Sequence, residues 1–268
     1  SSDLIAADSI ISSIQATHTH RRVNSATLNA EGLKSLIESE HARLIVALGD
    51  EAHRLVRAAN VPVKTIMTLS TAGLQDFETL DNAYGVHIIP DPAHVISELQ
   101  RIIGPKVRRI GYLYDESNAA SKRAADDLKK AGDSAALRAT VVAKPVSTTE
   151  DIRKALNELG GIDALIVSSD AAIVQNFRLI VRYQINESVP VFSPNAVFVK
   201  NGLFCALDVR ISDIAAAVVT LVRALPGDST PSRRFIYPTL NTANLVVNET
   251  VAGRMNIALQ GKDYTPAE

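Results

Sequence analysis

Cysteine and tryptophan are nearly or wholly missing: the 268 residues include one Cys and no Trp, with six Phe and six Tyr. A single thiol excludes an intramolecular disulfide and a cysteine-rich metal site. Cys205 lies in the apolar run LFCAL, which predicts a buried, inert thiol. The scarcity of aromatic rings and the net charge of −1 give no support for binding to nucleic acid or to an acidic membrane surface.

Long hydrophobic runs are also missing. No stretch of about 20 apolar residues occurs, so no membrane-spanning helix is predicted. The opening residues SSDLIAADSIISSI have no basic start and no long apolar block, so they predict an amphipathic helix and not a signal peptide. A domain that begins with a helix and has no first strand resembles a truncated domain. We expect either that a signal peptide and a first strand have been removed, or that the chain simply begins elsewhere.

The motifs of common enzyme classes are absent from the sequence. There is no GxSxG elbow, no P-loop and no GxGxxG fingerprint. Serine, histidine and aspartate occur at no spacing that pairs a nucleophile with a base. We therefore predict that the protein is not an enzyme and that it uses no cofactor or metal.

A repeated unit of strand, short polar turn and helix fills most of the chain. Several of its strands are nearly continuous apolar runs: LIVAL at 44–48, KTIMTL at 64–69, RIGYLY at 109–114 and DALIVS at 163–168. Strands buried on both faces have this composition, which is typical of parallel sheets covered by helices. Helices are predicted at 29–41 behind the cap Asn29, after the turn 49–51 to about residue 59, at 92–103, and after Thr148 or Thr149. A strand is predicted within 20–28. The fold class is therefore α/β.

Polar residues follow these strands at their carboxyl ends, where open parallel sheets bind ligands. The candidate ligand-binding residues are Gly49, Asp50, Ser70, Thr71, Tyr114, Glu116, Ser117, Asn118, Ser169, Asp170, Ser193, Asn195, Asp208 and Arg210, with His87 as a weaker candidate. Helix capping alone explains many of them singly. As a set they predict a cleft rich in hydrogen-bonding groups, in which helix N-termini favour an anionic group. Asp208 and Arg210 either form a structural pair or hold a carboxylate or hydroxyl of the ligand.

The order of these segments resembles a known family. The runs RRIGYLYDESNAAS, KPVSTTEDIRKALNEL, IDALIVSSDAAI and VPVFSPNAVFVKNGLFCALDV are similar to ABC-transporter substrate-binding proteins of the tryptophan-uptake kind. The run 114–117 stands where the family has Tyr-Asn-Pro-Ser, and 168–171 where it has Pro-Thr-Asp-Asn. The run 206–209 stands in place of Gly-Ile-Asp-Tyr. Upstream, LIVALGDEA resembles the family's Ala-Leu-Gly-Thr-Pro-Ala turn. The resemblance covers roughly residues 25 to 260.

This resemblance implies a type I periplasmic-binding-protein architecture, with two Rossmann-like lobes, three crossovers and a ligand cleft between the lobes. The first lobe is expected at 1–107 plus about 210–233, and the second at 108–209 plus about 234–268. Hinges are expected near 107–110, 207–211 and 234–237. The implied protein is extracytoplasmic, with its signal peptide removed. It acts as a monomer that closes around a small ligand and is then read by membrane permease subunits.

Departures from the family pattern bear on the ligand. Ala120-Ser121 replaces Asn-Ser, Ala171 follows Asp170, and Val209 replaces a tyrosine. These changes lower polarity or bulk, which favours a ligand that is less polar than an amino acid or simply different. The ligand classes left open are an amino acid, an aromatic compound and a less polar organic molecule. Two other classes remain open. A sensor domain of a membrane signalling protein would be continuous with a transmembrane segment and a catalytic domain. An enzyme of flavodoxin-like build would show a cofactor or turnover.

Overall fold

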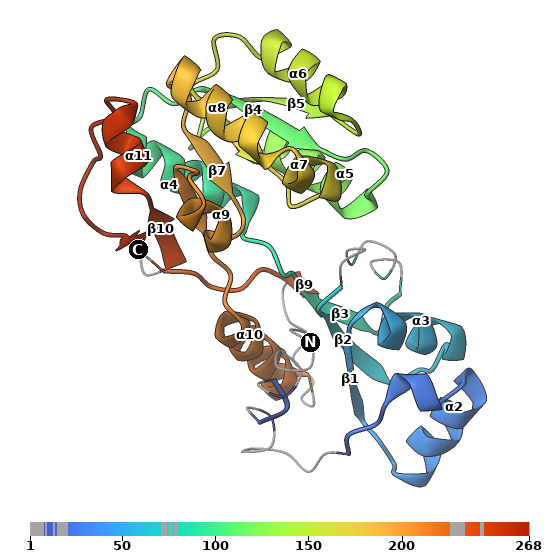
Figure 1. The fold of residues 1–268 in the computed structure, drawn as a ribbon. Coiled ribbons are helices and arrows are strands. Elements are labelled where there is room, and N and C mark those ends of the chain that lie inside the picture. The colour runs from blue at the N-terminus through green and yellow to red at the C-terminus, as the bar shows by residue number, and fades with distance from the viewer. Residues whose placement is uncertain are drawn as a thin grey trace. The chain divides into compact units, whose positions relative to one another are not determined.

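The computed structural model describes residues 8, 10–12, 14, 21–70, 74, 77, 80–225, 234–241 and 244–267. The chain divides into two compact units, each made of two segments (Figure 1). Unit 1 consists of Ser1–Ile89 and Arg210–Thr239, and unit 2 of Pro90–Val209 and Leu240–Glu268. The chain therefore passes between the units three times, at 89–90, 209–210 and 239–240.

Two of these passages differ from the sequence-based boundaries at 107 and 233. Helix α4 (Pro92–Ile103) contacts α5 (Ala119–Gly132), and its buried side chains Ile96, Leu99 and Ile102 belong to the core of unit 2. The segment 90–107 thus lies in unit 2 because its apolar face is buried there.

Unit 1 is built on a four-stranded sheet of order β1-β2-β3-β9. The strands are β1 (Leu44–Leu48), β2 (Lys64–Thr68), β3 (Ala83–Val86) and β9 (Phe235–Ile236), and all neighbouring pairs are parallel. Helix α3 (Asp50–Ala59) contacts β1 and α2 (Ala30–Ser39), whereas α10 (Ile211–Ala224) contacts β2 and β3. This arrangement confirms the predicted parallel sheet with covering helices.

The strand predicted within 20–28 is wrong for the described residues 21–28. They contain only a 3₁₀ turn, η1 (Ser25–Thr27). The side chain of Asn24 accepts a hydrogen bond from the Ala26 amide at 3.1 Å. Asparagine favours such local turns over a sheet ladder, which is the physical reason for the difference.

Unit 2 has a seven-stranded sheet of order β11-β10-β8-β7-β6-β4-β5. Its strands are β4 (Arg109–Tyr114), β5 (Thr140–Pro145), β6 (Ala164–Val167), β7 (Val191–Ser193), β8 (Cys205–Leu207), β10 (Leu245–Val247) and β11 (Thr265–Pro266). Strands β4 to β8 are parallel, and β10 adds to β8 in the antiparallel sense. The remaining helices are α6 (Thr149–Glu158), α7 (Ala171–Gln175), α8 (Phe177–Glu187), α9 (Ala196–Lys200) and α11 (Glu249–Arg254).

Both faces of this sheet are buried, as the continuous apolar runs predict. Along β4, Ile110 and Tyr112 pack in one cluster with α4, α5 and α11, whereas Leu113 packs in the other with α6 and α8. Cys205 is fully buried in the first cluster, and this burial raises the pKa of its thiol. Within the described residues, every helix is too short or too polar to cross a membrane.

Helix starts follow the capping residues. The Asn29 side chain accepts from the Gly32 amide at 2.8 Å, and Thr148 caps α6 in a capping box with Asp151. The segment after Asp170 forms two helices that meet at Asn176, and the polar turn 193–195 leads into α9.

Candidate ligand-binding site

The carboxyl end of β6 carries the most connected polar side chain among the candidates, Asp170. Its Oδ1 accepts hydrogen bonds from Asn118 Nδ2 at 2.7 Å and from Ser121 Oγ at 2.8 Å. Its Oδ2 accepts from the Asp115 amide at 2.7 Å and from the Ser168 hydroxyl. Only 7% of the residue is exposed. The carboxylate is therefore saturated by donors of its own unit.

These bonds join two strand ends that are neighbours in the sheet but far apart in sequence. Strand β4 pairs with β6, and the Ser168 amide donates to the carbonyl of Leu113 at 3.0 Å. Asn118 also caps α5, since its Oδ1 accepts from the Ala120 amide at 3.0 Å. Asp170 thus fixes the turn between β4 and α5, the turn in which three of the candidate residues lie, directly after the candidate Tyr114.

The candidates of this turn differ in exposure. The Tyr114 ring is buried in the core beside Tyr112, with ring centroids 5.6 Å apart, and burial raises the pKa of both phenols. Glu116 is exposed, 3.7 Å from the Lys122 ammonium. Ser117 is exposed and donates to Asp115 Oδ1 at 2.7 Å. The polar lip of unit 2 is therefore formed by 115–118, while the tyrosine ring faces inward.

The ends of β7 and β8 are joined in a similar way. Ser193 is fully buried, and its hydroxyl accepts from the Asn195 amide at 3.2 Å. Asn195 is exposed and caps α9 through the Val197 amide at 2.8 Å. The half-buried Asp208 accepts from the first amide of the same helix, that of Ala196, at 3.2 Å. Ser169, beside Asp170, is exposed.

In unit 1, the first strand end is a tight turn. Gly49 has φ +86° and precedes α3 without any side-chain cap, so a residue with a Cβ would be strained there. Asp50 Oδ1 accepts from the hydroxyl of buried Ser70, which follows β2, at 2.7 Å. The candidate Thr71 lies outside the described residues.

The other end of this sheet edge carries a stacked pair of rings. His87, directly after β3, stacks on Tyr237, directly after β9, with centroids 4.3 Å apart and planes 18° from parallel. The His87 amide also donates to the carbonyl of Ile236 at 2.9 Å. Both residues are half-buried. Sequence reasoning placed Tyr237 only in a hinge, although an aromatic residue just after a short strand was a signal for a role at the edge.

A second histidine of unit 1, His53, lies in α3, whose many charged residues predict a surface position, but only 2% of the residue is exposed. Its Nε2 lies 3.1 Å from the carbonyl oxygen of Ala47, which fixes the proton on Nε2, and Phe77 meets the ring edge-on at 5.4 Å. Its Nδ1 is the one buried side-chain polar atom without a hydrogen-bond partner in the described part of the chain. Burial lowers the pKa of this imidazole.

Arg210 is exposed at the start of α10, and its amide donates to Asp213 Oδ2 at 2.9 Å. It begins the second segment of unit 1, whereas Asp208 lies one residue before the end of the first segment of unit 2. Across the described ranges, no three His, Cys, Asp or Glu side chains gather where they could hold a metal ion.

The model of the ABC transporter substrate-binding protein family matches residues 14–263. The chain belongs to this family. A tyrosine-binding protein of Clostridioides difficile is 26% identical to this substrate-binding protein over 155 residues, which are 57% of this chain and 44% of the relative. The match thus spans less than half the length of that relative.

Solved structures show the same fold. A ligand-free, open substrate-binding protein with adhesive properties from Clostridium difficile has a TM-score of 0.67 at 16% identity, covering 98% of this chain and 94% of its own. An ABC domain in complex with L-Trp from Streptococcus pneumonia has a TM-score of 0.56 at 18% identity, covering 94% and 91%. This substrate-binding protein therefore has the type I periplasmic-binding-protein fold, as predicted.

Proposed function

We propose that the protein is the extracytoplasmic solute-binding component of an ABC-type uptake system and that it binds a small organic molecule without transforming it. The observation that carries the proposal is the family match over residues 14–263. The geometry agrees with it, because the parallel strands of each unit end in polar side chains along one edge of the sheet. Ligands of open α/β sheets bind at such edges.

An aromatic amino acid is the first candidate for the ligand. The partial relative is named a tyrosine-binding protein, and a protein of the same fold was solved with L-Trp. Within unit 1, the stacked rings of His87 and Tyr237 offer an aromatic surface at the strand ends. A ligand ring that packs on this surface would gain offset or edge-to-face contacts. A less polar organic molecule is the second candidate, because Val209 stands where the family resemblance has a tyrosine.

Different roles follow for the polar candidates. Asp170 accepts four hydrogen bonds from its own unit, so we assign it to positioning the 115–118 turn and not to contacting the ligand. The exposed guanidinium of Arg210 suits a ligand carboxylate. The amides after Gly49, at the start of α3, suit the same anionic group.

The proposed mechanism is closure of one unit on the other around the bound ligand. A ligand that contacts both units has a higher affinity for the closed state, and only that difference in affinity drives closure. The closed monomer is then recognised by membrane permease subunits, which release the ligand for transport.

A thermal-shift panel of amino acids, aromatic acids, sugars, nucleosides and small lipids tests the proposal. Tryptophan fluorescence cannot be used, because the chain has no Trp. A true ligand at a hundred times its Kd adds about 2.7 kcal/mol to the unfolding free energy, which raises Tm by several degrees. A flat panel would contradict the proposal.

A matched pair of variants locates the site. Tyr237→Ala removes one ring of the stacked pair and is expected to abolish the shift caused by an aromatic ligand. Tyr264→Ala removes a tyrosine of unit 2 whose hydroxyl donates to Glu249, and is expected to keep the shift. Equal shifts in both variants would exclude the His87–Tyr237 pair from the binding site.

A further inference from the structure

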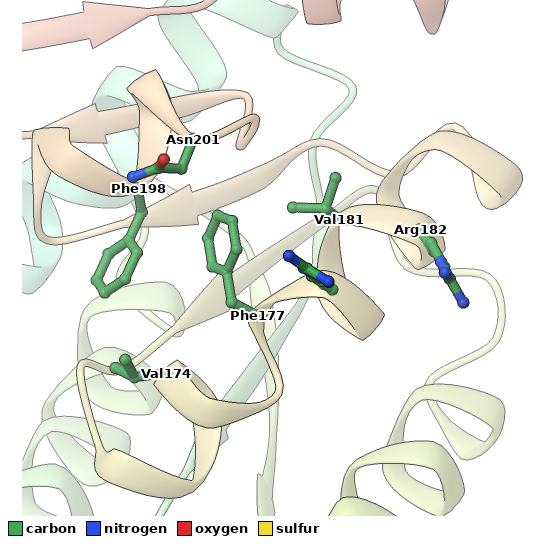
Figure 2. A pocket seen from close by; sticks show the side chains of 7 residues that line it. Val174, Phe177, Val181, Arg182, Phe198 and Asn201 are labelled. Atoms are coloured by element: carbon green, nitrogen blue, oxygen red, sulfur yellow. The ribbon is translucent and has the colours of Figure 1, made fainter.

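A pocket of about 480 Å³ lies on unit 2. It forms where α7 ends, α8 begins and α9 ends. Its aromatic wall is the pair Phe177 and Phe198, whose ring centroids are 5.3 Å apart. Figure 2 shows these rings side by side, with Val174 near them and Val181 farther along α8. None of the lining residues is one of the candidate ligand-binding residues.

The apolar surface extends beyond the pocket. Among the described residues, three large hydrophobic side chains are exposed: Val23 at 41%, Val174 at 40% and Val197 at 57%. Val174 lines the pocket, and Val197 precedes Phe198 on α9. We call the surface formed by 174–182 and 197–201 the α7–α9 surface. Val174 and Val197 thus add exposed apolar side chains on α7 and α9, the helices that border the pocket with α8, and contiguous apolar patches on soluble proteins often mark interaction sites.

Positive charge borders this apolar surface. Arg178 and Arg182 are exposed and one helical turn apart on α8, so their side chains lie on the same face. Among the residues that the structure describes, neither guanidinium forms an ion pair with a carboxylate. The chain as a whole carries a net charge of −1, so the local excess of positive charge is a property of this surface.

We propose that the α7–α9 surface docks an acidic segment of a partner protein, with an apolar side chain of that segment entering the pocket between Phe177 and Val181. Arginine and aromatic side chains contribute most of the binding energy in protein interfaces, and an apolar centre with a charged rim is their usual anatomy. The pocket alone would suit a small molecule. The exposed Val197 outside it and the two unpaired arginines along α8 form a wider surface, which fits an extended acidic chain better.

The first test is selection of a random 12-residue peptide library, displayed on phage, against the whole chain. Enriched peptides are expected to combine Asp or Glu with one large apolar residue. Their binding, followed by fluorescence anisotropy, is expected to weaken several-fold between low and 0.5 M salt, because the pairing is electrostatic at an exposed surface. An absence of enriched peptides, or enrichment of neutral or basic ones, overturns the proposal.

Matched charge variants then locate the binding surface. Arg178→Glu with Arg182→Glu is expected to weaken binding of the enriched peptides at least tenfold. Arg43→Glu with Arg54→Glu makes the same change in net charge at two exposed arginines of unit 1 and is expected to leave binding within twofold. If both double variants weaken binding equally, the interaction depends on net charge alone and the α7–α9 surface is excluded.

A pair of valine variants tests the apolar part of the α7–α9 surface. Val197→Asp is expected to weaken the same peptides about tenfold, whereas Val23→Asp changes an exposed valine of unit 1 and serves as the control. Neither valine is buried, so both variants should fold. Docking here is separate from ligand binding at the strand ends. Variants that lose the peptides but keep a ligand-induced thermal shift would support the docking surface, while loss of the shift alone bears only on the proposed ligand site.

Discussion

The two units connect the carboxyl ends of their strands by different kinds of interaction. In unit 2, one buried carboxylate, Asp170, accepts hydrogen bonds from the ends of both β4 and β6 and from α5. In unit 1, the described edge includes a stacked pair of rings, His87 and Tyr237, and a hydrogen bond between Ser70 and Asp50. A charge-assisted network has directional bonds that fix one geometry, whereas stacked rings can slide and tilt at low cost. The comparison indicates a rigid edge in unit 2 and an adaptable edge in unit 1.

The largest effect is expected from Asp170→Ala. The change leaves the amide of Asp115 and the side chains of Asn118, Ser121 and Ser168 without their acceptor. Each buried donor without a partner costs about 1–3 kcal/mol, and water will satisfy some of them. We expect a loss of about 4 kcal/mol in the unfolding free energy, measured by urea denaturation.

The matched control is Asp126→Ala, which removes an exposed carboxylate 3.8 Å from Lys129. Such surface pairs contribute about 0–1 kcal/mol. If Asp170→Ala cost no more than this control, the edge of unit 2 would not depend on its carboxylate, and the contrast with unit 1 would fail.

One glycine in each sheet, Gly85 in unit 1 and Gly111 in unit 2, allows the packing of the two units to be compared. A Cβ at Gly85 in β3 would lie 2.6 Å from the Phe235 ring and 2.7 Å from Leu74, whereas at Gly111 in β4 it would meet the terminal methyl of Ile162 at 2.9 Å. A ring yields less than a methyl group. We expect Gly85→Ala to cost about 3 kcal/mol and Gly111→Ala about 1 kcal/mol. Hydrogen exchange in β2 and β6 assigns each loss to its unit; equal losses would contradict the expectation.

Two asparagine caps sharpen the contrast further. Asn29 in unit 1 only caps α2, whereas Asn118 in unit 2 caps α5 and also donates to Asp170. We expect Asn29→Ala to cost about 1 kcal/mol, the usual value for a cap. Asn118→Ala should cost about 2 kcal/mol, because a hydrogen bond to a carboxylate is lost as well. Thermal denaturation of both variants measures the difference, and identical Tm values would show that the bond to Asp170 adds nothing.

The smallest effect is a pH dependence carried by His53 of unit 1. Burial lowers the pKa of the folded imidazole, while in the unfolded chain it stays near 6.5. Below that pH the unfolded state binds a proton that the folded state does not, so stability falls as the pH falls, by at most about 1.4 kcal/mol per pH unit, until the folded pKa is reached. His53→Gln keeps a donor for the Ala47 carbonyl and should flatten this slope. Urea denaturation at pH 7.5 and 5.5 measures it, with exposed His41→Asn as the control.

Local pattern was enough to predict most of the fold. The apolar run 44–48 coincides with β1, and 92–103 coincides with α4. Asn29 caps its helix as predicted, and Thr148 is the cap of the two alternatives, Thr148 and Thr149. These features depend only on residues within one turn or one strand, which a sequence displays directly. The division between α7 and α8 at Asn176 is harder to predict from the sequence. The side-chain amide of Asn176 donates to the carbonyl of Ala172, and helix propensity does not reveal such a bond.

The candidate site was harder to predict from the sequence, because its contacts join residues that are far apart in the chain. The strand-end rule selected Asp170 and Asn118 but could not show that they bond to each other, nor that Ser121 donates to Asp170 from 49 residues away. The pair of His87 and Tyr237 depends on β3 lying beside β9, which follows from topology and not from composition. The buried position of His53 was missed for the same reason: the ring is covered by Phe77.

The three passages of the chain between the units also decide when each unit can become stable during synthesis. Unit 1 lacks α10 and β9 until residue 236 has been made, and unit 2 lacks β10 and α11 until residue 254. Neither core can be complete when only the first two hundred residues have been synthesised. Unit 1 therefore cannot complete its packing before the first segment of unit 2, 90–209, has been synthesised, in contrast to a domain made of one continuous segment. Both units therefore gain later elements, α10 and β9 for unit 1 and β10 and α11 for unit 2, within one short stretch of translation.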